Sequence, residues 1–157
     1  MYIARRGFSN RIWISQNEPL AWRFATTNAG GSHLADYLTG EQLMEAVKEI
    51  PVMVKEGRNI PFVVLDVRQN HERQIQDMIS EWRHDDQAFK IPRVNQPYEE
   101  IVMGQWNKAA FFREQWIVIA CQRGLRAGQA MRYLKNEGFN CKVLLGGVDK
   151  LPSELIL

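Results

Sequence analysis

The chain has 157 residues and a mass of 18.2 kDa, a length that suits one domain and leaves no room for two full ones. Hydrophobic residues make up 45% of it and charged residues 24%, which excludes a disordered or low-complexity protein. The 20 basic residues nearly balance the 18 acidic ones, so the total charge predicts no general affinity for nucleic acid or a membrane surface.

Residues 1–36 differ in character from the rest and are interpreted as an N-terminal extension of a domain formed by residues 37–157. The extension carries four arginines and a loop-forming stretch, TTNAGGS, at residues 26–32. Residues 12–14 and 22–24 predict a pair of short strands that would cap an edge of the sheet. As a basic arm, the same segment would contact a protein partner, with nucleic acid the less favoured choice.

The first periodic segment predicts a helix. Thr39 followed by Gln42 fits a capping box, and Pro51 is expected to end the helix. The apolar positions that follow helical spacing are Leu43, Ala46, Val47 and Ile50. Next, residues 62–65 form a short apolar run between Pro61 and Asp66, which predicts a strand buried on both faces.

A second helix is predicted to begin with Asn70 as its cap and to continue to Trp82. Its apolar positions are Ile75, Met78, Ile79 and Trp82. Residues 83–104, interrupted by Pro92 and Pro97, predict a long connection, and a short helix is expected near Ala109.

The clearest strand spans residues 116–120 and runs through a six-residue loop into a helix that Gly138 ends. The apolar positions of this helix are Ala127, Ala130, Met131 and Leu134. Residues 143–145 predict another strand, and residues 152–155 one helical turn. Strands that alternate with helices in this way predict an α/β fold with a mostly parallel sheet and helices on both faces.

The loop from Cys121 to Arg126 carries the strongest chemical signal. Cys121 falls at the carboxyl end of a predicted strand, where ligands of open α/β sheets bind. Amides at the start of the next helix, together with the guanidiniums of Arg123 and Arg126, would favour a thiolate. Gly124 permits the positive φ that lets several amides converge on one sulfur or one anion. Cys121 is therefore predicted to be a reactive nucleophile, with ordinary core packing as the alternative.

Cys141 precedes a predicted strand and is assigned to packing. Two cysteines are too few for the disulfide framework of a small secreted domain, although a single bridge stays open. The sequence has neither an N-terminal apolar run of signal-peptide length nor a stretch near the ~18 apolar residues of a membrane span. We therefore expect a cytoplasmic protein that does not bind membranes.

Four segments, in this order, resemble the successive signatures of a rhodanese-like domain. They are LDVRQNHE (residues 65–72), IACQRGLRA (119–127), EGF (137–139) and LLGGV (144–148). The resemblance covers roughly residues 37–152. It implies a three-layer α/β fold in which helices flank a central, mostly parallel sheet.

The resemblance also implies a thiosulfate sulfurtransferase. Cys121 would take a sulfane sulfur from a small anionic donor such as thiosulfate, hold it as a persulfide, and pass it to a thiol or to cyanide, without a cofactor. The residues implied to bind the substrate are Gln122, Arg123, Gly124, Leu125 and Arg126. An Asp-x-Arg-x-x-x-Glu stretch implies a structural set of ion pairs formed by Asp66, Arg68 and Glu72. No metal is expected, because the sequence lacks Cys-x2-Cys and His-x3-His spacings.

Two other functions are weighed against sulfur transfer. The Gly-His-Ile-x-Gly-Ala segment of the family is replaced by DDQAFKIP at residues 85–92, which leaves open a non-catalytic binding or redox-sensing module. Related phosphatases and arsenate reductases have a Cys-x5-Arg loop, whereas this chain has Cys-x4-Arg, with Ala127 in the seventh position. The shorter loop favours sulfur transfer over phosphate or arsenate chemistry.

Overall fold

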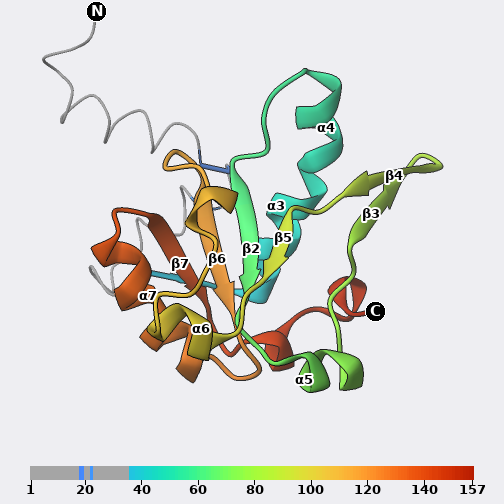
Figure 1. Ribbon diagram of the computed structural model, residues 1–157. Coiled ribbons are helices and arrows are strands. Elements are labelled where there is room, and N and C mark those ends of the chain that lie inside the picture. Colours follow the sequence, from blue (N-terminus) through green and yellow to red (C-terminus); the bar gives the residue numbers. More distant parts are fainter. Residues whose placement is uncertain (1–17, 20–21, 23–35) are drawn as a thin grey trace, which may run out of the picture.

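The computed structural model describes residues 18, 19, 22 and 36–157 (Figure 1). The predicted strand pair and the basic arm of residues 1–36 therefore lie outside the described residues, apart from Glu18, Pro19, Trp22 and Asp36. In the described part of the chain, no helix is long and apolar enough to cross a membrane.

A five-stranded sheet forms the centre of the domain, with the strand order β1-β7-β6-β2-β5. Its strands are β1 (Tyr37–Leu38), β2 (Phe62–Asp66), β5 (Arg93–Asn95), β6 (Trp116–Ala120) and β7 (Asn140–Leu144). Every neighbouring pair is parallel, and the carboxyl ends of the strands therefore share one edge. The strands predicted at residues 62–65 and 116–120, β2 and β6, take inner positions. β2 is buried at every residue and β6 at every residue after Trp116, as expected of strands covered on both faces.

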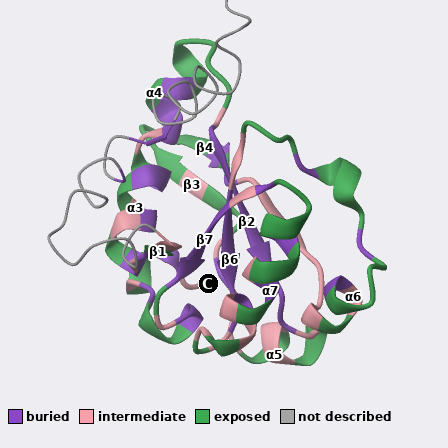
Figure 2. Cartoon of the chain, turned by 90° about the vertical axis from the view of Figure 1, so that its left-hand side faces the viewer, coloured by how far each residue is buried: buried purple, intermediate pink, exposed green. Residues whose placement is uncertain are grey.

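Helices cover both faces of the sheet (Figure 2). The α-helices are α3 (Gly40–Lys48), α4 (Ile50–Lys55), α5 (Asn70–Ile75), α6 (Tyr98–Val102) and α7 (Leu125–Asn136), and the short 3-10 turns are η2 (Lys108–Ala110), η3 (Val148–Lys150) and η4 (Ser153–Leu155). Successive β2 residues face opposite layers: Phe62 and Val64 pack with α3, while Val63 and Leu65 pack with α6 and α7. The three-layer α/β architecture expected from the sequence is confirmed.

The predicted capping box begins α3. The Gln42 amide donates to Thr39 Oγ1 at 3.1 Å, and the Thr39 amide donates to Gln42 Oε1 at 2.9 Å. The prediction that Pro51 ends the helical segment is wrong, because α4 begins at Ile50 and holds Pro51 in its first turn. A proline is tolerated there, since the first amides of a helix have no partner within it.

The second predicted helix is much shorter than its apolar spacing suggests. Gln69 rather than Asn70 is the N-cap of α5, and the helix ends at Ile75, whose side chain is 85% exposed. Met78 instead forms a β-bridge with Ile156, and Trp82 lies in a strand. The four apolar residues therefore have helical spacing in the sequence but do not lie on one helix in the structure.

The connection predicted for residues 83–104 is structured. An antiparallel hairpin of β3 (Glu81–His84) and β4 (Gln87–Lys90) extends away from the sheet (Figure 1). Asp85 and Asp86 turn it with φ values of 51° and 63°, a region that aspartate tolerates better than most residues. β5 and α6 follow, so the connection supplies an edge strand of the main sheet. The C-terminal elements β6, α7 and η4 lie where the sequence predicted them, whereas β7 begins three residues earlier than predicted and includes Cys141.

Candidate active site

Cys121 follows β6 directly at the carboxyl edge of the sheet, and its side chain is buried. Its Sγ accepts hydrogen bonds from the amides of Gly124, at 3.0 Å, and Ala127, at 3.4 Å. Gly124 has a φ of 111°, which a residue with a Cβ rarely adopts and which turns the loop back over the sulfur. The sulfur therefore lies in a small cradle of backbone amides, a setting that stabilises negative charge.

The outer side of the loop is held by η3. The amides of Val148 and Asp149 donate to the carbonyl oxygens of Cys121 and Gln122, at 2.9 Å and 3.1 Å. Gly147 allows this approach, because a Cβ at that position would collide with both carbonyl oxygens. The glycine pair of the LLGGV segment, Gly146-Gly147, therefore lies where the cysteine loop needs close support from η3.

Both loop guanidiniums are engaged by carboxylates. Arg126 donates to both oxygens of Glu72, at 2.7 Å and 2.5 Å, from within the partly buried wall of the site. Arg123 Nε lies 3.5 Å from Asp149 Oδ2, with a side chain that is 86% exposed. The sequence predicts these two charges beside the thiol, and in the structure each of them is also paired with an acid.

The side chain of Gln122 belongs to a polar network beside the loop. Its Oε1 accepts from Arg68 Nη1 at 3.0 Å, and its Nε2 donates to Gln76 Oε1 at 2.9 Å and to Asp149 Oδ1 at 2.6 Å. Leu125, the remaining residue expected to bind substrate, is 76% exposed at the start of α7. Of the residues expected to form the cradle, Gly124 contributes its amide to the sulfur.

The Asp-x-Arg-x-x-x-Glu stretch divides into two ion pairs. Asp66 and Arg68 have no exposed surface and form two close contacts, Nε to Oδ1 at 3.0 Å and Nη2 to Oδ2 at 2.8 Å. Arg68 Nη1 also donates to the carbonyl oxygen of Gln76 at 2.7 Å. Glu72 joins Arg126 instead of these two residues. The stretch therefore secures both the end of β2 and the cysteine loop.

The fold is similar to those of several solved structures. A rhodanese-related protein from Thermoplasma volcanium superposes with a TM-score of 0.50 at 18% identity, over 77% of this chain and 96% of its own. The domain has a rhodanese-like fold. A rhodanese-like domain protein from Staphylococcus aureus (TM-score 0.47, 17% identity, 74% of this chain and 91% of its own) and a rhodanese homolog from Thermus thermophilus (0.38, 27%, 66% and 94%) are also similar. Neither a family model nor a curated protein sequence matches the chain.

Two residues that support the Cys121 loop were not singled out in the sequence. Gln76 and Asp149 are 46 and 27 positions away from Gln122, whose side chain they bind. Neither stands in a motif, and no local spacing connects them to the loop. Only the three-dimensional approach of α5 and η3 to the end of β6 brings them there.

Cys141 differs from Cys121 in its surroundings. Both cysteines are free, so the disulfide left open by the sequence is not formed. Burial in β7 raises the pKa of the Cys141 thiol to about 12, which keeps it protonated. Among residues 36–157 and the three described residues before them, no group of His, Cys, Asp or Glu is arranged to hold a metal ion.

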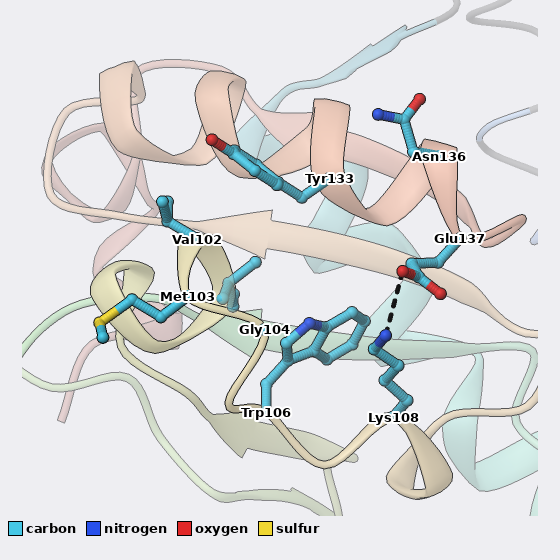
Figure 3. Close-up of a pocket in the computed structure, with 9 residues that line it drawn as sticks. Val102, Met103, Gly104, Trp106, Lys108, Tyr133, Asn136 and Glu137 are labelled. Atoms are coloured by element: carbon cyan, nitrogen blue, oxygen red, sulfur yellow. Dashed lines mark ion pairs between the residues drawn. The ribbon is translucent and has the colours of Figure 1, made fainter.

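A separate shallow groove of about 310 Å³ lies between α6 and α7 (Figure 3). It is lined by Ile101, Val102, Met103, Gly104, Trp106, Lys108, Tyr133, Asn136 and Glu137. An ion pair of 3.0 Å between Lys108 and Glu137 crosses one end of it. Since none of the lining residues belongs to the Cys121 loop, the groove is not part of the candidate active site.

The Glu72–Arg126 pair predicts a pH-dependent contribution to stability. Hydrogen bonds from Arg126 lower the pKa of Glu72 to about 2 from the model-compound value of 4.5. The stabilisation is therefore complete above pH 4.5 and declines as the pH falls towards 2. We expect Glu72→Gln to lower the free energy of unfolding by about 1–2 kcal/mol at neutral pH and by progressively less in acid.

Urea denaturation of the unmodified protein and of Glu72→Gln, at several pH values below neutrality, measures the difference in their free energies of unfolding. Glu56→Gln is the matched control, because Glu56 pairs with Arg58 at 2.9 Å on the surface beyond α4. A Glu72→Gln effect that stays constant as the pH falls would contradict the assignment.

Proposed function

We propose that this rhodanese-like domain is a sulfurtransferase that carries a sulfane sulfur as a persulfide on Cys121. The observation that supports it best is the pair of amides, from Gly124 and Ala127, that donate to Sγ at the carboxyl edge of the sheet. Amides fixed in this way stabilise a thiolate, and the same loop can stabilise the negative outer sulfur of a persulfide. A reducing compartment such as the cytoplasm would keep both free cysteines in this state.

The reaction has two steps. The Cys121 thiolate attacks the sulfane sulfur of the donor, a new S–S bond forms, and the rest of the donor leaves with the electron pair of the broken bond. With thiosulfate as donor, sulfite would leave. In the second step a thiolate or cyanide attacks the outer sulfur of the persulfide, and the Cys121 thiolate is released. Atoms and charges balance in both steps without a cofactor.

Intact-protein mass and cyanide-dependent turnover test this proposal. After treatment with thiosulfate or with an organic hydropersulfide, the protein should gain one sulfur atom from at least one of them and should transfer it to cyanide as thiocyanate. Cys121→Ser should form no adduct, and its rate of cyanide-dependent turnover should fall at least about a thousandfold. Cys141→Ala is the matched control and should keep both. The absence of any adduct on the unmodified protein, or an adduct that persists in Cys121→Ser, would overturn the proposal.

A further inference from the structure

We infer that Asp149 is a positioning residue for Cys121 and that it acts through the side chain of Gln122. Asp149 lies in η3, outside the cysteine loop, and contacts the residue that follows the nucleophile. Because the effect is read in the turnover of Cys121, the inference rests on the proposed function.

Asp149 binds Gln122 at two points. The Asp149 amide donates to the carbonyl oxygen of Gln122 at 3.1 Å, and Asp149 Oδ1 accepts from Gln122 Nε2 at 2.6 Å. The acceptor of the second bond is a carboxylate, and hydrogen bonds to carboxylates are stronger than those between neutral groups. Two bonds to one residue fix its orientation as well as its distance from η3.

The side chain of Gln122 uses all of its donors. Nε2 donates one hydrogen to Asp149 and the other to Gln76 Oε1 at 2.9 Å, while Oε1 accepts from Arg68 Nη1 at 3.0 Å. Arg68 is itself buried against Asp66. The side-chain amide of Gln122 therefore cannot rotate without breaking a hydrogen bond, and removal of the Asp149 acceptor leaves one N–H without its partner.

The place of Gln122 in the chain transmits this restraint to the sulfur. Gln122 directly follows Cys121, and Gly124, two residues later, donates its amide to Cys121 Sγ at 3.0 Å. A fixed Gln122 therefore limits the movement of the short backbone segment that connects the sulfur to this donor. Stabilisation of a thiolate depends on donors that are in place before the reaction, so the restraint should appear in the rate.

η3 is a firm support for this contact, because core side chains flank Asp149. Val148 is 1% exposed and Leu151 is 9% exposed, and both pack in the core on the α3 side of the sheet. Gly147, with a φ of 66°, lets η3 approach the carbonyl oxygens of the loop. The Asp149 carboxylate is thus held from the protein interior, although 41% of its side chain is exposed.

The other neighbour of the carboxylate contributes less. Arg123 Nε lies 3.5 Å from Asp149 Oδ2, and the Arg123 side chain is 86% exposed. An exposed ion pair of this kind is screened by water and adds little. The bond to Gln122 is shorter and belongs to a network that Arg68 anchors, so it should decide the effect of Asp149.

Two neutral variants of the full chain test the inference. Asp149→Ala removes the acceptor of Gln122 Nε2, whereas Asp149→Asn keeps an oxygen for it and loses the same charge. Cyanide-dependent turnover is measured with thiosulfate or with the organic hydropersulfide, whichever loads Cys121. We expect Asp149→Ala to lower kcat/KM at least about tenfold, which corresponds to about 1.4 kcal/mol, and Asp149→Asn to stay within about threefold of the unmodified protein. Unchanged turnover in Asp149→Ala, or an equal loss in Asp149→Asn, would overturn the inference.

A double-mutant cycle tests the route through Gln122. Gln122→Ala alone should lower kcat/KM about as much as Asp149→Ala, and the double variant should be no slower than either single variant, because both changes remove the same contact. Losses that multiply in the double variant would contradict this route.

Asp36→Ala is the matched control. Asp36 is 39% exposed in its side chain and pairs with Lys135 at 2.7 Å, in the last turn of α7, at the opposite end of that helix from the cysteine loop. Its loss should leave turnover unchanged. The mass of the unmodified protein separates the two possible failures. If Cys121 gains no sulfur, the proposed function fails and the inference with it; if sulfur is gained and Asp149→Ala turns over normally, only the inference fails.

Discussion

Replacing Arg68 with methionine should lower the free energy of unfolding by about 3–5 kcal/mol, because the buried Asp66 carboxylate loses its closest counter-ion and is left with Arg73 Nε at 4.0 Å from Oδ2. Neither side chain has exposed surface, and Arg68 is bonded to both oxygens of Asp66. The guanidinium also holds Gln122 Oε1, so the residue after Cys121 loses a support at the same time. Urea denaturation monitored by tryptophan fluorescence measures the loss of stability.

Two further variants separate the buried charge from lost packing. The double substitution Asp66→Leu with Arg68→Met removes both charges and should recover most of the stability, since apolar residues often replace a buried pair without cost. Lys48→Met breaks the exposed pair with Glu45 on α3 and should change stability by at most about 0.5 kcal/mol. If Arg68→Met costs no more than Lys48→Met, the buried pair does not hold the site together.

The sequence predicts the fold well where a local secondary-structure signal coincides with burial against the sheet. The α3 capping box, the buried strands β2 and β6, and α7 each combine a local signal with a face that the sheet covers. The positive φ expected at Gly124 is found, because the amides of the loop must turn back towards the sulfur. Each of these features is encoded within about a dozen neighbouring residues.

The secondary structure of residues 76–104 does not follow from their local sequence in this way. Trp82 follows helical spacing from Ile75, yet it pairs across the hairpin with Phe89, because contact between two strands outweighs a weak local helical preference. Within the described part of the chain, β5 is an edge strand that pairs only with β2, and it lacks the apolar run that marks an inner strand. Such strands form because a neighbouring strand is available to pair with them, and the local sequence does not show that neighbour.

The position of Cys121 at the end of a strand could be predicted from the sequence, but the ion pairs around its loop could not. Cys121 and its amides follow from the order strand, loop, helix. The partner of Arg126 does not, because Glu72 lies 54 residues earlier and was grouped with Asp66 and Arg68 by its motif. The loop is bonded to Arg68 through Gln122, to Glu72 through Arg126, and to η3 through its carbonyl oxygens. These contacts fix the loop amides before any substrate binds.

Replacing Trp22 with alanine should also lower the free energy of unfolding by about 3–5 kcal/mol, the usual cost of truncating a buried tryptophan. Trp22 has no exposed surface, its ring centroid lies 5.6 Å from that of Phe62, and its Nε1 donates to the Gln42 carbonyl oxygen at 3.2 Å. It therefore covers β2 and α3 from a position that precedes the predicted domain. Urea denaturation again measures the effect.

Trp22→Phe is the matched control, because it keeps an aromatic ring beside Phe62 and removes the hydrogen bond to Gln42. It should cost about 1 kcal/mol, so most of the loss in Trp22→Ala comes from packing. A Trp22→Ala variant within about 0.5 kcal/mol of the unmodified protein would show that the ring contributes nothing to the core. With the expected loss, a chain that begins at residue 37 should be less stable than the full chain by a similar amount, because it lacks the ring that closes this end of the core.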